Sequence, residues 1–273
     1  MKTVSLLGSG WLGLPLGQAL HAKGWAVHAA TTQPGKCEVL ANAGFVPHLL
    51  EITGQMSQNE TFGLLHDSAM FWESETLIVT LPFRRHFPDP FVYVAQMREI
   101  LRHMSPHKRL LFTSSTSYYP TCDHEVDEDL QFSPIAPRLR ALAAAESVIM
   151  SHPGPTTVLR LGGLYGPDRP IRSFATRGLA TQATHSHVNL IHRDDVIGII
   201  MTILEDDAGW GHVWNAVSDG HPTRAALYGV TPETPLAAGS NEFPAATPSG
   251  KIVANHKLKM ALNYHFCYPN PLP

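Results

Sequence analysis

Cysteine is scarce in this chain of 273 residues. The three cysteines are odd in number and far apart, so the sequence supports neither a disulfide framework nor a zinc site with closely spaced ligands. Histidine is more abundant, with 16 residues, but only His185 and His187 form a close pair, and no third ligand follows at a recognisable spacing. We therefore expect no metal centre.

Charge is also sparse, and long apolar runs are missing. Charged residues make up 16% of the chain, the formal net charge is -3, and lysine and arginine do not cluster along one predicted helix. A nucleic-acid partner needs a basic surface and is therefore not expected. The apolar run near the N-terminus is too short for a signal peptide or a membrane span. The expectation is a cytoplasmic protein without a membrane partner.

A glycine-rich turn lies close to the N-terminus. The β-forming run Thr3–Leu7 leads into a Gly-x-Gly-x-x-Gly pattern, and residues 14–23 are mostly good helix formers. In such a strand–turn–helix unit the glycines allow a tight turn, close approach of a pyrophosphate and close packing of the helix on the strand. A purely structural turn is the alternative, since turns commonly contain glycine. We expect dinucleotide binding at Gly8, Ser9, Gly10, Trp11, Leu12 and Gly13.

The next predicted strand, residues 26–30, is not followed by the acidic residue that commonly binds the ribose 2′-hydroxyl of NAD. Thr31, Thr32 and Lys36 stand there instead, and two hydroxyl groups and a lysine can bind and neutralise a 2′-phosphate. NADP is therefore the predicted cofactor, and NAD is less favoured. A polar loop with a solvated lysine is the alternative interpretation of these residues.

Two further apolar runs predict buried strands that end beside the cofactor. The first, residues 75–81, stops at a proline, so we expect Leu81 and Pro82 next to the dinucleotide, because ligands bind at the carboxyl ends of parallel strands. The second, residues 109–112, runs into five consecutive hydroxyl residues and two tyrosines. Buried hydroxyl groups need hydrogen-bond partners, so this segment predicts a site rather than packing.

These motifs resemble those of the extended short-chain dehydrogenases/reductases, in particular the atypical branch of NAD(P)-dependent epimerases/dehydratases. Residues 114–120 match the family's Ser-Ser-x-x-Val-Tyr-Gly strand end. Residues 159–167 match its Leu-Arg-x-x-x-x-Tyr-Gly-Pro segment, and residues 189–196 its Ile-His-Val-Asp-Asp-Val motif. The resemblance implies a Rossmann-like α/β fold, a three-layer α/β/α parallel sheet. It also implies a Rossmann domain at residues 1–165 and a smaller substrate lobe at 166–273, with 189–217 returning to the sheet.

The chain departs from this family at the catalytic pair. The family uses Tyr-x-x-x-Lys, in which the lysine lowers the pKa of the tyrosine. When Glu146 is aligned with the family's usual acid, Arg138 takes the place of the tyrosine and Leu142 that of the lysine. Arg138 then either binds an anionic group of the substrate or the nicotinamide ribose region, or is a solvated helix residue.

The resemblance places Ser115 at the position of the family's catalytic Ser/Thr, and we expect Ser115 and Tyr119 nearest the reacting carbonyl. Tyr118 or Tyr119 could act as a general acid, but a pKa near the ordinary value of about 10 would make either one a poor base. The candidate catalytic residues are therefore Ser115, Tyr118, Tyr119 and Arg138.

The predicted function is that of an NADP-dependent oxidoreductase or epimerase/dehydratase-like enzyme acting on an unknown small metabolite. The features are compatible with a homodimer. The alternative is a catalytically inactive NADP-binding sensor or regulator, because binding and chemistry are separable in this fold. A dehydrogenase of the hydroxy-acid type would share the glycine turn but not the downstream motifs.

Four expectations concern the second half of the chain. Asp194 is expected to cap a helix. Thr223 is expected to cap a helix over residues 222–228. The proline-rich residues 229–249 are expected to form a loop over the site. The buried face of the helix after Asp194 is expected to consist of Val196, Ile199, Ile200 and Ile203.

Overall fold

A seven-stranded parallel sheet forms the centre of the protein. The computed structural model describes residues 1–52, 64–65, 69–84, 88–171, 185–228 and 250–272. The strand order is β12-β9-β7-β6-β1-β2-β3, and every neighbouring pair is parallel. The predicted Rossmann-like α/β class is therefore confirmed. The strands are β1 (Thr3–Leu7), β2 (Ala26–Thr31), β3 (Val46–Leu49), β6 (Thr76–Val79), β7 (Arg109–Ser115), β9 (Thr156–Leu161) and β12 (Val213–Ala216).

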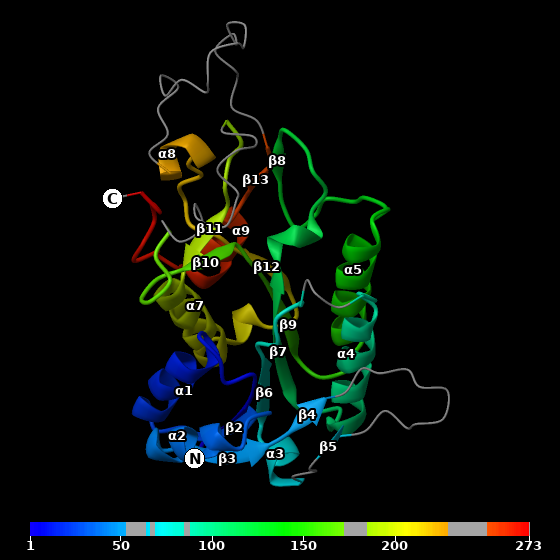
Figure 1. Cartoon of the computed structure of the whole chain (residues 1–273), viewed down its shortest axis with the longest axis vertical. Helices are drawn as coiled ribbons and strands as arrows, with labels where there is room; N and C mark the ends of the chain where they lie inside the picture. The colour runs from blue at the N-terminus through cyan, green and yellow to red at the C-terminus, as the bar shows by residue number, and fades with distance from the viewer. Residues whose placement is uncertain (53–63, 66–68, 85–87, 172–184, 229–249, 273) are drawn as a thin grey trace, which may run out of the picture.

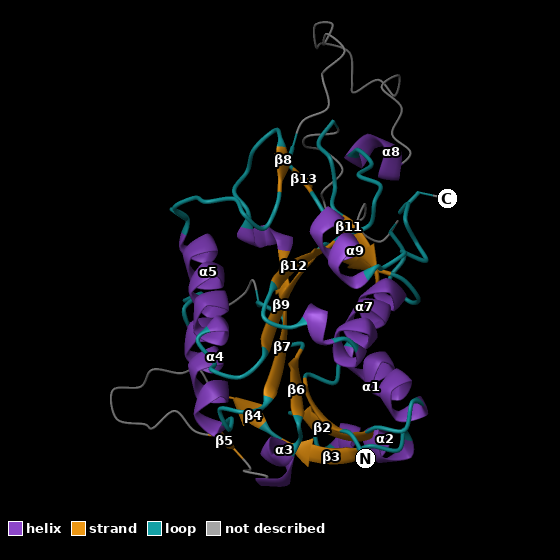
Figure 2. Cartoon of the chain, turned by 180° about the vertical axis from the view of Figure 1, so that it is seen from behind, coloured by secondary structure: helices purple, strands orange, loops and turns teal. Residues whose placement is uncertain are grey.

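Helices cover both faces of this sheet (Figures 1 and 2). One face carries α1 (Gly13–Ala22), α2 (Gly35–Asn42), α7 (Arg193–Glu205) and α9 (His256–Leu262). The opposite face carries α3 (Ala69–Glu73), α4 (Val92–His103) and α5 (Pro137–Met150). A strand that is buried on both faces is apolar along its length, which explains the nearly continuous apolar runs in the sequence.

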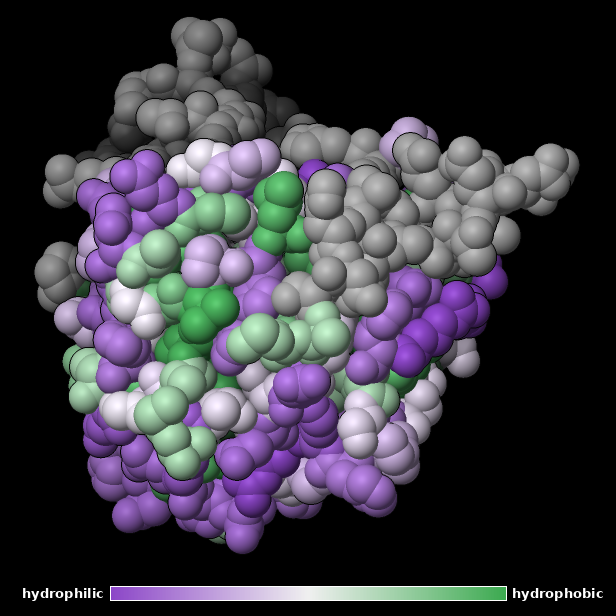
Figure 3. Space-filling model, turned by 90° about the horizontal axis from the view of Figure 1, so that it is seen from below, coloured by the Kyte–Doolittle hydropathy of each residue, from purple (hydrophilic) through white to green (hydrophobic). Residues whose placement is uncertain are grey.

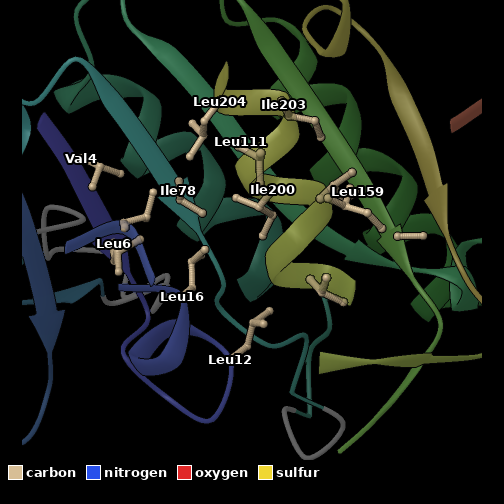
Figure 4. Packing of buried hydrophobic residues seen from close by; sticks show 14 of the residues in the cluster. Val4, Leu6, Leu12, Leu16, Ile78, Leu111, Leu159, Ile200, Ile203 and Leu204 are labelled. Carbon is tan, nitrogen blue, oxygen red and sulfur yellow. The ribbon is translucent and has the colours of Figure 1, made fainter. Parts of the chain in front are cut away.

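Two apolar clusters result, one on each face of the sheet. Successive residues of β1 point to opposite faces of the sheet, as expected for a strand. Leu6 belongs to the cluster under α1 and α7, and Leu7 belongs to the cluster under α4 and α5. Figure 4 shows side chains of the sheet, α1 and α7 converging in the first cluster. The expected buried face of α7 is confirmed, since its four residues are fully buried: Val196, Ile199, Ile200 and Ile203.

The N-cap of α7 differs from the expectation. The helix begins at Arg193, and His192 is the N-cap, with its Nδ1 accepting a hydrogen bond from the Asp194 N–H at 3.2 Å. Asp194 therefore lies inside the first turn, where its negative charge still interacts favourably with the helix dipole. Asp195 is buried, and its carboxylate accepts hydrogen bonds from backbone N–H groups of the C-terminal segment, including that of Cys267 at 2.7 Å. The contacts of both aspartates therefore stabilise the fold, at the start of α7 for Asp194 and at the C-terminal segment for Asp195.

Short elements lie beyond the carboxyl ends of β7, β9 and β12 (Figure 1). Two small parallel sheets are formed there, one by β10 (Gly163–Tyr165) with β11 (Leu190–His192) and one by β8 (Glu125–Val126) with β13 (Ile252–Val253). Of residues 189–217, β12 joins the main sheet and α7 packs on it, whereas β11 lies outside the main sheet. The remaining short elements are β4 (Glu51–Ile52), β5 (Leu64–Leu65), η1 (Thr116–Tyr118), η3 (Asp207–Gly209) and α8 (Arg224–Tyr228).

The expected cap of α8 is confirmed, because the Thr223 hydroxyl accepts a hydrogen bond from the Ala226 N–H at 3.3 Å. The loop predicted at 229–249 lies outside the described residues. No helix within the described ranges combines the length and apolar character needed to cross a bilayer. From below, apolar side chains are interspersed among polar ones (Figure 3).

Candidate functional site

A cavity of about 620 Å³ lies at the carboxyl ends of β1, β6, β7 and β9. The chain leaves β1 toward α1 on one face of the sheet and leaves β6 toward α4 on the other, so the cavity is at the switch point where ligands bind in open α/β sheets. The lining comes from the glycine turn, residues 80–83, residues 113–117, the start of α5 and the segment after β9.

The glycine turn is closed on its helix side. Gly8 has φ of 114°, a left-handed value that favours glycine, and its carbonyl oxygen accepts a hydrogen bond from the Thr80 hydroxyl at 2.6 Å. A Cβ atom on Gly13 would lie 1.9 Å from the same oxygen of Gly8, which no side chain could tolerate. Helix α1 can therefore pack against the turn only because Gly13 has no side chain.

The same turn is open on its cavity side. A Cβ atom on Gly10 would meet no other atom within 4 Å, and Gly10 lines the cavity. No side chain caps the N-terminus of α1, where backbone N–H groups lack partners within the helix. An open space beside an uncapped helix N-terminus suits an anionic group such as a pyrophosphate.

The other residues of the turn anchor it to its surroundings. The Ser9 hydroxyl donates a hydrogen bond to the Ala30 carbonyl oxygen at 2.8 Å, which joins the turn to the end of β2. The Trp11 indole N–H donates to the Pro167 carbonyl oxygen at 3.0 Å. Trp11 and Leu12 both line the cavity. The turn therefore has a fixed position between β2 and the segment that follows β10.

The residues predicted to select NADP lie outside the cavity lining, with Thr31 and Thr32 at the end of β2 and Lys36 in the first turn of α2. Thr31 is buried, and its hydroxyl accepts a hydrogen bond from the Gln33 N–H at 3.1 Å, so this hydroxyl already has a structural partner. Thr32 and Lys36 are exposed. The two of them can reach a group bound beyond β2 more easily than Thr31 can.

The ends of β6 and β7 supply the middle of the cavity. Leu81 and Pro82 line it as expected, and the Leu81 carbonyl oxygen accepts a hydrogen bond from the Tyr93 hydroxyl at 2.8 Å. Ser115 and Ser117 also line it. The Ser115 hydroxyl oxygen accepts from the Ser117 N–H and lies 3.1 Å from the Ser117 hydroxyl oxygen. Ser115 is therefore held at the cavity by the turn that follows β7.

Tyr119, expected beside Ser115, lies elsewhere. It is 1% exposed and is not among the residues that line the cavity. Its hydroxyl donates to the Asn215 Oδ1 at 2.8 Å and accepts from the Arg160 Nη1 at 2.9 Å. Burial raises the pKa of Tyr119 to about 12, although the charge and hydrogen bond of Arg160 lower it. The 3-10 turn η1 redirects the chain after Ser115 and places Tyr119 against β12.

Tyr118 likewise lies outside the cavity lining. The guanidinium carbon of Arg160 lies 3.5 Å from the centre of the Tyr118 ring, so the ring covers one face of this cation. Neither tyrosine is therefore in the position expected for a general acid that touches a substrate in the cavity. Sequence reasoning assigned no role to Arg160, because the Leu-Arg motif does not reveal what the arginine contacts.

Arg160 forms a buried ion pair with Glu146. The Nη2 atom of Arg160 donates to Oε2 of Glu146 at 2.8 Å, and both residues are buried. The Ser114 hydroxyl donates to Oε1 of Glu146 at 2.5 Å. Ser114 lines the cavity, so this ion pair supports the cavity wall from behind.

Helix α5 contributes the cavity wall on which the sequence resemblance predicts the catalytic pair. Arg138, Leu139 and Leu142 line the cavity, so the two positions of the expected tyrosine and lysine do face the site but hold arginine and leucine. The Arg138 guanidinium lies 4.9 Å from the centre of the Phe83 ring. Arginine stays protonated, so this wall offers a cation and apolar groups, without a proton acceptor.

A second arginine, Arg169, lines the cavity near the glycine turn. Its guanidinium lies 5.5 Å from the centre of the Trp11 ring. Sequence reasoning missed Arg169, since only the fold brings it to Trp11. Among the described residues no group of three potential metal ligands occurs, and His185 and His187 belong to no such group.

Comparisons with known proteins agree with this architecture. No family model matches the chain. A UDP-glucuronic acid 4-epimerase from Bacillus cereus, solved in complex with NAD, has a TM-score of 0.69 at 17% identity and covers 98% of this chain and 94% of its own. A short-chain dehydrogenase/reductase superfamily protein from Agrobacterium tumefaciens, solved with bound NAD, has a TM-score of 0.69 at 16% identity and covers 97% and 92%.

Sequence similarity extends to Protein YeeZ of Escherichia coli K12. The two chains are 32% identical over 280 residues, which is 100% of this chain and 98% of YeeZ. An identity of this level across the whole length of both chains shows that the chain belongs to the YeeZ family, and the TM-scores show that it has the fold of the short-chain dehydrogenases/reductases.

Proposed function

We propose that this chain is an NADP-dependent oxidoreductase or epimerase/dehydratase-like enzyme that acts on a small metabolite. The observation that carries the proposal is the cavity, which extends from the glycine turn past Leu81 to Ser115. The two solved structures of the same fold named above bind NAD, which supports a nicotinamide dinucleotide as the ligand. Such a dinucleotide supplies a hydride donor or acceptor when bound.

The residues fit this ligand in shape and charge. The glycine turn would hold the pyrophosphate, because the space at Gly10 is open and the N-terminus of α1 carries no side-chain cap. Leu81 and Pro82 would contact the middle of the ligand from the end of β6. Two exposed residues, Thr32 after β2 and Lys36 in the first turn of α2, would bind the 2′-phosphate of NADP.

The contacts around β7 revise the proposed catalytic roles. Ser115 lines the cavity and would donate a hydrogen bond to the reacting carbonyl oxygen, with Ser117 beside it. Tyr119 is held by Asn215 and Arg160, so we propose that it stabilises the fold behind the cavity instead of contacting substrate. Arg138 cannot accept a proton and would bind rather than act as a base.

A thermal-shift comparison of NADPH, NADP, NADH and NAD tests the proposal, because a ligand that binds the folded state raises the melting temperature. We expect the largest shifts from the phosphorylated cofactors. Lys36→Ala should reduce the NADPH shift to that of NADH and leave the NADH shift unchanged. Lys23→Ala, which removes an exposed lysine at the C-terminal end of α1, is the control. A larger shift with NADH than with NADPH would contradict the cofactor assignment.

Turnover distinguishes the enzyme from a sensor. With NADPH bound, a panel of carbonyl compounds should include at least one that oxidises it, and Ser115→Ala should slow that reaction. The replacement of the family's tyrosine and lysine positions by Arg138 and Leu142 is the observation that favours a sensor. Tight NADPH binding without hydride transfer to any compound of the panel would support the sensor.

A further inference from the structure

The charged lining of the cavity is of one sign. Among the described residues that line it, Arg138 and Arg169 are charged, and none carries a carboxylate. Glu146, on the same helix as Arg138, is buried and bound to Arg160 and Ser114. Arg138 is exposed and Arg169 is half-buried, and two guanidinium groups around one cavity favour a ligand with negative charge.

The two arginines lie on different walls. Arg169 stacks on Trp11, which belongs to the glycine turn. Arg138 belongs to the first turn of α5 and stacks on Phe83, which follows β6. Phosphates of a dinucleotide resting on the glycine turn would therefore have Arg169 beside them. The guanidinium of Arg138 would serve a different anionic group.

The surroundings of Arg138 are those of a binding residue. Its planar guanidinium lies over the Phe83 ring, and Leu139 and Leu142 continue the same wall as apolar surface. Ser115, the proposed partner of the reacting carbonyl, lines the same cavity from β7. A substrate bound here would present an anionic group to Arg138 and a carbonyl or hydroxyl group to Ser115.

We propose that Arg138 binds the anionic group of the substrate, and that the substrate class is a small carboxylated or phosphorylated metabolite. This inference rests on the proposed function, since it concerns the substrate of the same site. Arg138 thus takes the position at which the resemblance predicts a proton-transfer group, but it contributes to the affinity and orientation of the substrate. A planar fork of N–H donors can bind a carboxylate or a phosphate through two parallel hydrogen bonds.

Calorimetric titration of the NADPH-saturated protein tests the proposal. The probes are malonate, inorganic phosphate and neutral malonamide, at constant ionic strength set with chloride. We expect malonate or phosphate to bind, and malonamide to bind at least about tenfold more weakly. Arg138→Met should lower the affinity for the anion by about tenfold or more. The anion that binds more tightly identifies the substrate class, carboxylated for malonate and phosphorylated for phosphate. Binding of either anion that depends on Arg138 supports the proposal.

Arg140→Met is the matched control. Arg140 lies on the same helix, stacks on Phe91 at 5.8 Å and does not line the cavity, so this variant should bind the anions as the unmodified protein does. Equal affinity in Arg138→Met and the unmodified protein would overturn the proposal, as would equal losses in both variants or no anion binding at all. If the unmodified protein does not bind NADPH when it is titrated before the anions are added, that result contradicts the proposed function instead.

Discussion

The Nη2 atom of Arg160 lies 2.8 Å from Oε2 of Glu146 behind the cavity wall, and the two residues are 5% and 4% exposed. Removing one partner leaves a buried charge without compensation. We expect Arg160→Met to lower the free energy of unfolding by about 3–5 kcal/mol in a denaturant titration. The double variant Arg160→Met with Glu146→Leu should recover part of that loss. A single variant as stable as the unmodified protein would show that the ion pair is not needed.

Tyr119 and Ser115 should differ in what they affect. Tyr119→Phe removes a hydroxyl that has two buried partners, so we expect it to cost about 1–3 kcal/mol of stability and to leave the rate of turnover nearly unchanged. Ser115→Ala removes a cavity-lining hydroxyl and should slow turnover by about tenfold or more with little loss of stability. Measurements of kcat and of the melting temperature for both variants distinguish a catalytic role from a structural one. Slow turnover in a stable Tyr119→Phe protein would show that Tyr119 takes part in the reaction.

Two glycines of the same turn should respond differently to alanine. Gly10→Ala adds a methyl group to open space, so the cofactor-free protein should melt normally but lose most of the NADPH-induced shift. Gly13→Ala forces a Cβ to within 1.9 Å of the Gly8 carbonyl oxygen, so the cofactor-free protein itself should be destabilised. Thermal melts with and without NADPH separate the two effects. An unchanged NADPH shift in Gly10→Ala would mean that the phosphates bind elsewhere.

A histidine pair between β2 and β3 should make stability depend on pH. His28 Nδ1 lies 2.9 Å from His48 Nε2, and burial together with the neighbouring His28 lowers the pKa of His48 to about 4. In the unfolded chain the pKa of a histidine is about 6.5, so between these values the unfolded state binds more protons. The free energy of unfolding should therefore fall as the pH falls from about 6.5 toward 4.

Melting temperatures measured across this pH range in His48→Gln should fall less steeply. His107→Gln, which replaces an exposed histidine, should keep the slope of the unmodified protein. Identical slopes in all three proteins would show that the buried pair does not cause the acid sensitivity.

Local patterns predicted the parts of the site that lie within one strand–turn–helix unit. The glycine spacing anticipated the open space at Gly10 and the close packing at Gly13, because both depend on residues near in sequence. The apolar run before Pro82 likewise predicted a strand end at the cavity, and the structure places Leu81 and Pro82 there. The buried face of α7 followed from its helical period.

Contacts between distant segments could not be predicted in this way. A run of hydroxyl residues and tyrosines does not show where the strand stops, and the 3-10 turn after Ser115 decides that Tyr119 packs against Asn215 of β12. Arg169 lies over Trp11 of the glycine turn, whose indole also bonds to Pro167, and both contacts join segments that are far apart in sequence. The predicted cap of α7 is wrong because the imidazole of His192, two residues before Asp194, accepts the capping hydrogen bond.

A nicotinamide dinucleotide bound at the N-terminus of α1 is the central requirement of the proposed function. Calorimetric titration of the purified protein with NADPH measures this directly. We expect saturable binding of one NADPH per chain, and loss of that binding in Gly10→Ala. A folded protein that shows no saturable binding of NADPH, NADP, NADH or NAD would contradict the proposed function.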